Sequence, residues 1–334
     1  MTRPRMRSPA LPVLVAVAAG AVVPVQSRVN AELSHRLGDA VGAAAISFTG
    51  GAIIMTVLAL CLPRLRQALL SLPRVTRERR LPRRYLLAGM LGGTFTLAQS
   101  TTALITGIAV FTVSAIAGQT LGGLIVDARG VGGVLRQRPG VHRLAGAALT
   151  LVAAVVSALP GLSGAPATVL LPALLAVAAG LLLGLQQAMN GATGAAVASP
   201  LAATWVNFAV GAVFLGLAWT AKTLAFGLGG HPLPTQWWAY LGGACGVVFI
   251  ATSALLVRRI GVLLLGMASI AGQLLGSIVL DAVLPSGDHA PGAFTVVGAV
   301  LTFAAVWIAA HRKQERKEEP RCPTTASSSR ARIR

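Results

Sequence analysis

Charged side chains are scarce in this sequence. They make up 11% of its 334 residues, and only nine residues are acidic, whereas soluble domains carry about 25% charged residues. Hydrophobic residues reach 55% and the mean hydropathy is +0.75, in repeated apolar runs near the roughly 20 residues that cross a bilayer. The shortage of charge excludes an ordinary soluble domain. It predicts an all-α polytopic membrane protein, because the short alternating segments of a β-barrel are missing.

Cysteine and histidine are also few. The three cysteines, Cys61, Cys245 and Cys322, share no short spacing, which gives no support to a zinc site or a disulfide framework. The five histidines form no pair on one helical face. The sequence also has no Ser/His/Asp cluster and no G-x-x-x-x-G-K-[ST] nucleotide-binding motif. It therefore predicts neither an enzyme nor a bound metal or cofactor.

The 28 Lys and Arg residues give a net charge of +19. In a soluble protein this charge would suggest nucleic-acid binding, but here it lies in loops and tails between apolar runs, so no nucleic-acid partner is expected.

Ten spans are predicted, near residues 11–33, 41–62, 85–105, 108–127, 143–161, 167–190, 200–221, 237–257, 262–284 and 291–310. With the N-terminus inside, the inner segments hold 25 of the 28 cations. This asymmetry predicts both termini in the cytoplasm.

Two segments of the sequence recur. AAGAVVPVQSRVN at 18–30 matches AAGLLLGLQQAMN at 178–190, at an offset of 160 residues. SAIAGQTLGGLIVD at 114–127 matches ASIAGQLLGSIVLD at 268–281, at an offset of 154. Because the first segment also occurs inside the chain, a cleaved signal peptide at the N-terminus is not expected.

The repeat divides the spans into two sets of five. Since five is odd, the second set enters the membrane from the opposite side, which is the inverted-topology repeat of many secondary transporters. The predicted units are a basic cytoplasmic N-terminus, two five-helix repeats and a basic disordered cytoplasmic tail, at residues 1–10, 11–161, 162–311 and 312–334.

The five-plus-five plan resembles the drug/metabolite transporter superfamily, whose members include EamA-like proteins. Within it, GAVVPVQSRVNAELSHRLGDAVGAAAISFTGG and SAIAGQTLGGLIVD resemble the YdcZ-like family, here as two fused copies over roughly residues 11–311. The resemblance implies a bacterial plasma (inner) membrane location, a transport function and export as its direction. It leaves the substrate open.

Polar residues inside the spans are the candidate substrate contacts. Gln119 and Gln273 lie mid-span, and the pairs Gln26/Asn30 and Gln186/Asn190 are each one helical turn apart, on one helical face. Amides in hydrocarbon need partners, so these six residues either contact substrate or join helices by hydrogen bonds. Both interpretations stay open at this point.

Small and acidic residues complete the candidate set. Small residues four apart let helices approach closely, and this spacing predicts packing contacts at Gly118, Gly122, Gly272 and Gly276. Three acidic residues are candidates for coupling transport to an ion: Glu32, Asp127 and Asp281. The alternatives are a surface ion pair of Glu32 with Arg28, and solvated carboxylates at helix ends for the two aspartates.

Together these features predict a secondary transporter of a small molecule, working by alternating access and driven by an ion gradient. The expected partners are that small molecule and the lipid bilayer, and a homodimer is compatible with the pattern. A passive facilitator is the alternative within the same class, and a non-catalytic membrane scaffold is the alternative from another class. Amides around a common cavity would favour transport, whereas amides in packed seams would favour the scaffold.

Overall fold

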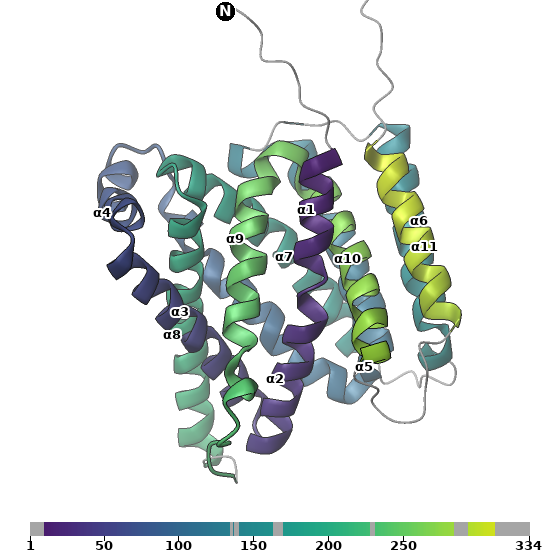
Figure 1. The fold of residues 1–334 in the computed structure, drawn as a ribbon, viewed down its shortest axis with the longest axis horizontal. Coiled ribbons are helices and arrows are strands. Elements are labelled where there is room, and N and C mark those ends of the chain that lie inside the picture. The colour runs from purple at the N-terminus through teal and green to yellow at the C-terminus, as the bar shows by residue number, and fades with distance from the viewer. Residues whose placement is uncertain are drawn as a thin grey trace, which may run out of the picture.

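The computed structural model describes residues 10–133, 136, 140–162, 170–227, 231–283 and 293–310. Nearly all of the predicted basic N-terminus and the whole tail at 312–334 lie outside these ranges. The regular elements in the described residues are helices (Figure 1). They are α1 (Ala10–Gly20), α2 (Val23–Leu37), α3 (Ala40–Cys61), α4 (Pro63–Arg77), η1 (Arg83–Leu87), α5 (Ala88–Arg129), η2 (Val131–Gly133), α6 (Val141–Leu162), α7 (Leu170–Ala196), α8 (Pro200–Phe226), η4 (Trp237–Tyr240), α9 (Gly242–Ile260), α10 (Val262–Val283) and α11 (Ala293–Ala310).

Among the described residues, seven helices are long and apolar enough to cross a membrane, and two shorter apolar helices lie within α6 and α11. The prediction of an all-α polytopic membrane protein is therefore confirmed, while the count of ten spans stays a prediction. α1 and α2 together form the first candidate span, Ala10–Leu37. Asp39 then starts α3 as its N-cap, and its Oδ1 accepts hydrogen bonds from the N–H groups of Val41 and Gly42.

α5 doubles back on itself. A straight helix of its 42 residues would be about 63 Å long, twice the thickness of a bilayer core. Yet the rings of Phe95 and Phe111 lie 6.0 Å apart, centroid to centroid. Beyond its two ends, the Gly132 N–H donates to Tyr85 Oη over 3.3 Å. The chain therefore reverses between Phe95 and Phe111, and α5 consists of two antiparallel limbs.

α4 is an element that the sequence analysis missed, because its arginines made residues 63–84 read as a loop. Its apolar residues nevertheless recur at helical spacing, and Leu65, Ala68 and Val75 are buried against the bundle. Pro63 at the first helical position suits the start of a helix, since its missing N–H is not needed there.

The two halves of the sequence are interlocked. The main contacts of α1, α3, α5 and α6 are with α10, α8, α7 and α11, all of which belong to the other half. Figure 1 shows this for α6 and α11, which lie side by side. The repeats are therefore not two bundles placed next to each other.

Contacts between the halves occur in symmetric pairs. The backbone of Gly118 in α5 packs against Val177 of α7, and that of Gly272 in α10 packs against Val17 of α1. Gly272 follows Gly118 by 154 residues, and Val177 follows Val17 by 160, which are the offsets of the sequence repeat. The same helix contact therefore occurs twice in the structure, once from each half to the other.

α3 and α8 run antiparallel. The start of α3 meets the end of α8, where Trp219 Nε1 donates to Asp39 Oδ2 over 2.9 Å. Toward the other end, Trp205 Nε1 of α8 donates to Thr56 Oγ1 of α3 over 3.0 Å. Because a twofold axis that exchanges two antiparallel helices must be perpendicular to them, the pseudo-symmetry axis crosses the bundle sideways.

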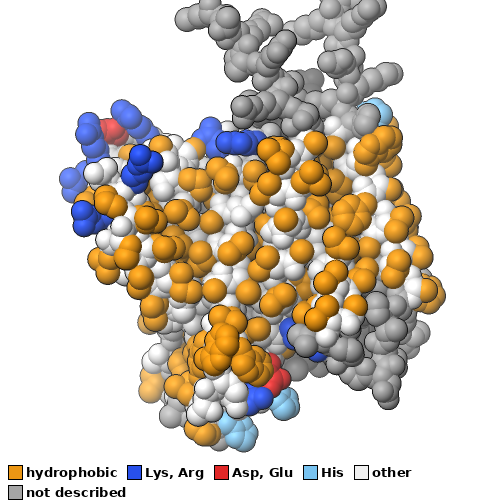
Figure 2. Space-filling model, in the orientation of Figure 1, with side chains coloured by type: hydrophobic (Ala, Val, Ile, Leu, Met, Phe, Trp, Pro, Cys, Tyr) orange, Lys and Arg blue, Asp and Glu red, His pale blue; other side chains and the backbone are white. Residues whose placement is uncertain are grey.

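The two ends of the bundle differ in charge. One, called here the arginine-rich end, includes α4, η1, Arg143 and the ends of α5 and α9; there Gly133 approaches Arg258. The opposite end holds Arg36, whose guanidinium lies 5.6 Å from the Trp238 ring, and Lys222. Figure 2 shows basic side chains gathered along the upper edge and beside α4, above a broad hydrophobic band.

Candidate functional site

A cluster of three amides joins α7 to α8. Asn207 Oδ1 accepts hydrogen bonds from Gln186 Nε2 over 2.8 Å and from Asn190 Nδ2 over 3.1 Å. The three side chains are buried, with exposed fractions of 0–4%. Gln186 and Asn190 are one turn apart on α7, so a single acceptor on α8 can receive both N–H groups.

The amide cluster sits against a glycine of the other half. A Cβ atom on Gly92 in α5 would overlap Gln186 Nε2, so the close approach depends on glycine at this position. Several polar atoms here have no partner in the described residues. Both side-chain polar atoms of Gln187 and the Nδ2 of Asn207 are buried without a hydrogen bond, although buried polar groups are normally paired.

The first half carries a related arrangement. Gln26 and Asn30 are half-buried on α2, and both face α9, whose Gly246 approaches Gln26 Nε2 and whose Gly242 approaches Asn30 Oδ1. Gly246 follows Gly92 by 154 residues, just as Gln186 follows Gln26 by 160. Both glutamine–asparagine pairs predicted from the sequence therefore lie where one half meets the other.

The two arrangements differ in their third member. Ser47 in α3 occupies the position that corresponds to Asn207, and its Oγ lies close to Gly242 together with Asn30 Oδ1. That oxygen of Asn30 is buried and has no hydrogen-bond partner in the described residues. The second half thus has an amide cluster joined by two side-chain hydrogen bonds, while the corresponding polar side chains of the first half have fewer hydrogen bonds to one another.

Two phenylalanines, one from α3 and one from α8, pack against each other near Gln26. The rings of Phe48 and Phe208 are 5.3 Å apart, centroid to centroid, at an angle of 49°. Each ring occupies the space next to the other helix's glycine, Phe48 at Gly211 and Phe208 at Gly51. Gln26 is close to this pair, because a Cβ on Gly246 would lie 3.0 Å from both Gln26 Nε2 and Phe208 Cζ.

Gln119 and Gln273 are placed differently from each other. Gln119 is 7% exposed and lies beside Gly266 of α10, and its Nε2 has no hydrogen-bond partner in the described residues. Gln273 is half-buried, about two turns further along α10. Gln119 therefore contacts the helix that carries Gln273, but about two turns away from Gln273 along that helix.

The four predicted packing glycines all lie at close contacts between helix backbones. Gly118 and Gly122 of α5 meet Val177 and Leu181 of α7, and Gly272 and Gly276 of α10 meet Val17 of α1 and Ala21, the residue after α1. In each case a Cβ atom would overlap backbone atoms of the facing helix or lie within 3.0 Å of them.

Asp127 is not a solvated helix-end carboxylate, so that interpretation is wrong. It is 1% exposed, and it accepts hydrogen bonds from the N–H groups of Val262 (2.7 Å) and Leu263 (3.1 Å). It also forms an ion pair with Arg143. The carboxylate thus caps α10 of the other half, where the N-terminal end of a helix favours negative charge. The side chain of Asp281, its counterpart in the repeat, lies outside the described residues.

Glu32 forms a half-exposed ion pair, the kind of contact that one interpretation predicted, although that interpretation had Arg28 as the cation. The cation that the structure places against it is Arg36, whose Nε lies 2.6 Å from Glu32 Oε1, one turn after Glu32 on α2. Exposed pairs of this kind contribute little to stability. The pair lies at the opposite end, near Trp238.

The structure adds Asp39 to the acidic residues that connect the halves. Its carboxylate is 5% exposed and receives the Nζ of Lys222 at 2.7 Å and the Nε1 of Trp219, both from α8. Burial by itself would raise the pKa of Asp39. The hydrogen bonds from Lys222, the Gly42 N–H and Trp219, together with the charge of Lys222, outweigh burial and hold the pKa below its ordinary value.

This pKa shift predicts a pH-dependent loss of stability. Because the folded-state pKa is depressed, Asp39 stabilises the fold above its ordinary pKa of 3.8, and this contribution disappears as the pH falls from there through the folded-state value. We expect Asp39→Asn to lower the melting temperature of the detergent-solubilised protein at pH 7. We also expect it to reduce the amount by which the melting temperature falls when the pH is lowered from 7 to 3. An unchanged drop would contradict this role, and Glu78→Gln, at an exposed ion pair, is the matched control.

Asn207, Gln187 and Asp39 were missed as site residues. The repeat alignment pairs Asn207 with Ser47 and Gln187 with Ser27, so these amides looked less symmetric than their neighbours. Asp39 follows Gly38 directly before an apolar run, which is the signal of a helix N-cap. Its bonds to α8, 180 residues away, left no trace in the local pattern.

Two cavities can be described, and neither touches the amides. One, of about 460 Å³, lies between α4 and the turn from α7 to α8. The other, of about 320 Å³, is apolar and lies between the first candidate span and α10. Gln119 and Gln186 are instead buried against glycines of the other half.

Two stretches of the chain, 11–156 and 171–308, match one family model of the drug/metabolite transporter group, described as "Putative inner membrane exporter, YdcZ". The chain belongs to the YdcZ family. The two stretches follow the two halves of the sequence repeat, so the YdcZ pattern occurs twice in this chain, as the resemblance implied. Family membership and the membrane-crossing helices support a multi-pass inner-membrane transporter rather than an enzyme.

No curated protein matches this YdcZ-family chain. A solved structure described as "Crystal structure of protein" is similar over 90% of this chain and 95% of that chain, with a TM-score of 0.63 and 18% sequence identity. At this level of identity the likeness supports the fold alone.

Proposed function

We propose that this YdcZ-family protein is a secondary transporter that exports a small molecule across the inner membrane by alternating access. The observation that carries the proposal is the symmetric placement of the two glutamine–asparagine pairs, each facing a glycine of the other half. Residues at the interface of two pseudo-symmetric halves are the ones whose surroundings change when the halves rock against each other.

The proposed topology has ten crossings and both termini in the cytoplasm. The seven candidate spans, the two shorter apolar helices and the first limb of α5 together give ten. The arginine-rich end then faces the cytoplasm. In a cysteine-free variant, we expect a membrane-impermeant maleimide to label Arg77→Cys only in inverted vesicles and Thr235→Cys, in the exposed loop before η4, only in spheroplasts. Labelling of both from one side would overturn this topology.

Both ends of the bundle are held together by buried carboxylates in the described state. Asp39 joins α3 to α8 at the opposite end, and Asp127 joins α5 to α10 at the arginine-rich end. Each bond connects one half with the other. Alternating access would require these two connections to open in turn, so the described conformation corresponds to an occluded state.

The chemistry of the seam indicates the kind of substrate. The side chains gathered there are amides, a hydroxyl and two phenylalanine rings, and several buried amide atoms have no partner in the described residues. Amides both donate and accept hydrogen bonds. A small molecule with uncharged donors and acceptors and an apolar part would satisfy these atoms when the seam opens.

Flux through proteoliposomes tests the function. We expect purified protein to move at least one compound of a labelled panel of small polar molecules, and to move it faster when a pH gradient is imposed. Replacing both seam glutamines, in Gln26→Leu/Gln186→Leu, should lower this flux about tenfold, since each polar group of the substrate left without a hydrogen-bond partner costs about 1–3 kcal/mol. Gln236→Leu, in the loop before η4, is the matched control.

The outcomes separate the alternatives. Flux that ignores the gradient would favour a passive facilitator, and flux equal in all three proteins would move the substrate site away from the seam. A membrane scaffold is the second candidate, because neither described cavity reaches the amides. Absence of flux for every compound, from protein that remains folded, would support the scaffold.

A further inference from the structure

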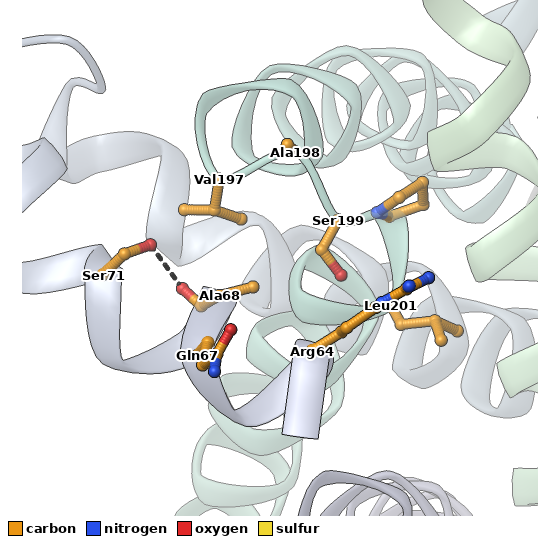
Figure 3. Close-up of a pocket in the computed structure, with 9 residues that line it drawn as sticks. Arg64, Gln67, Ala68, Ser71, Val197, Ala198, Ser199 and Leu201 are labelled. Carbon is orange, nitrogen blue, oxygen red and sulfur yellow. Dashed lines mark hydrogen bonds between the residues drawn. The ribbon is translucent and has the colours of Figure 1, made fainter. Parts of the chain in front are cut away.

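The cavity of about 460 Å³ at the arginine-rich end has a polar wall and an apolar floor (Figure 3). Its polar wall comes from α4, where Arg64, Gln67 and Ser71 are spaced three and four residues apart and so share one helical face. The turn from α7 to α8, at residues 197–201, forms the facing wall. In Figure 3 the Arg64 side chain extends from α4 toward Leu201.

Arg64 is the arginine of α4 that lines the cavity, and no carboxylate of the described residues pairs with it. Arg74 and Arg80 both pair with Glu78, over 2.8 and 2.9 Å. Arg64 is exposed and forms no hydrogen bond or ion pair with the described part of the chain. A guanidinium that projects into a cavity without a carboxylate is suited to bind a phosphate group.

α4 lies where lipid headgroups would be. It begins two residues after Cys61, the last residue of the membrane-crossing α3, and its buried face packs Leu65 and Ala68 against the bundle. Away from that face, Leu70 is 73% exposed. A short helix with arginines, one buried face and an exposed leucine is suited to the interface of a membrane, with the leucine among the acyl chains.

We propose that the cavity between α4 and the α7–α8 turn binds the headgroup of an anionic phospholipid, with Arg64 contacting its phosphate. Gln67 in the same wall can donate to headgroup oxygens, and the Ser71 hydroxyl, which donates to the Ala68 carbonyl, can accept from a headgroup hydroxyl. Ala68, Val197 and Leu201 provide the apolar part of the lining. Charge complementarity favours this occupant, because residues 63–84 hold eight arginines and only one acidic residue. The site is independent of the transport proposal.

Native mass spectrometry of the delipidated full-length protein tests this site. We expect phosphatidylglycerol to bind more tightly than phosphatidylcholine with the same acyl chains. Arg64→Gln should weaken phosphatidylglycerol binding about fivefold, which corresponds to the contribution of about one arginine near an anionic surface. Arg66→Gln, two residues along the same helix but outside the cavity, should change binding less than twofold.

A second variant separates the cavity from the general charge of α4. Val197→Trp fills the cavity without changing any charge, and it should weaken phosphatidylglycerol binding by a similar factor in protein that melts at the wild-type temperature. Equal losses in Arg64→Gln and Arg66→Gln would overturn the site in favour of a diffuse charge effect. Unchanged binding in Val197→Trp, or competition by inorganic phosphate at an equal concentration, would also overturn it.

Discussion

Asn207→Leu is expected to abolish most of the transport by this protein. The change removes the single oxygen that receives both Gln186 and Asn190, and it leaves two buried N–H groups unpaired among apolar neighbours. Each unpaired group costs about 1–3 kcal/mol, so we expect flux to fall at least about tenfold and the melting temperature to fall as well. Flux in proteoliposomes and thermal unfolding in detergent measure the two effects.

The repeat itself provides the control for this experiment. Ser47 occupies the corresponding position in the first half, so Asn207→Ser gives the second half a side chain that the fold already accommodates there. A serine hydroxyl can still accept a hydrogen bond. We expect Asn207→Ser to keep the fold and a larger share of the flux than Asn207→Leu. Equal flux in wild type and both variants would show that the amide cluster plays no part in transport.

Gly272→Ala is expected to disrupt the packing of the two halves. The added Cβ would overlap the backbone oxygen of Val17 on α1, and a backbone cannot move aside as a flexible side chain can. Overpacking of this kind costs about 1–3 kcal/mol or more. We expect a lower melting temperature, a lower yield of monodisperse protein and a loss of flux.

Gly216→Ala is the matched control, because nothing lies within 4 Å of the Cβ that it would add to α8. It should be neutral or slightly stabilising, since alanine favours helix over glycine by about 1 kcal/mol. Gly118→Ala is the symmetric counterpart of Gly272→Ala and should behave like it, because its Cβ would overlap the oxygen of Val177 on α7. A stable, active Gly272→Ala protein would contradict the close packing of α1 on α10.

The candidate site was only partly readable from the sequence. Gln26, Asn30, Gln186 and Asn190 stood out because polar residues are rare in apolar runs and because they recur at one offset. Asn207 did not stand out, since its importance comes from accepting two hydrogen bonds from α7 and not from its own surroundings in the chain. Asp127 was recognised, but its burial and its cap on α10 depend on residues about 135 positions away.

The sequence alone indicated the class of this protein, its division into two related halves and the unequal sharing of cations between its two sides. These properties follow from hydropathy, repetition and arginine counts, which can be read from the chain without knowing which residues contact each other. Only the tertiary structure decided that the halves interlock, that α5 reverses between Phe95 and Phe111, and that α4 is a helix beside a cavity. Such features depend on which apolar surfaces meet. Apolar helices carry many nearly equivalent faces, so the glycine contacts between the halves select the pairing.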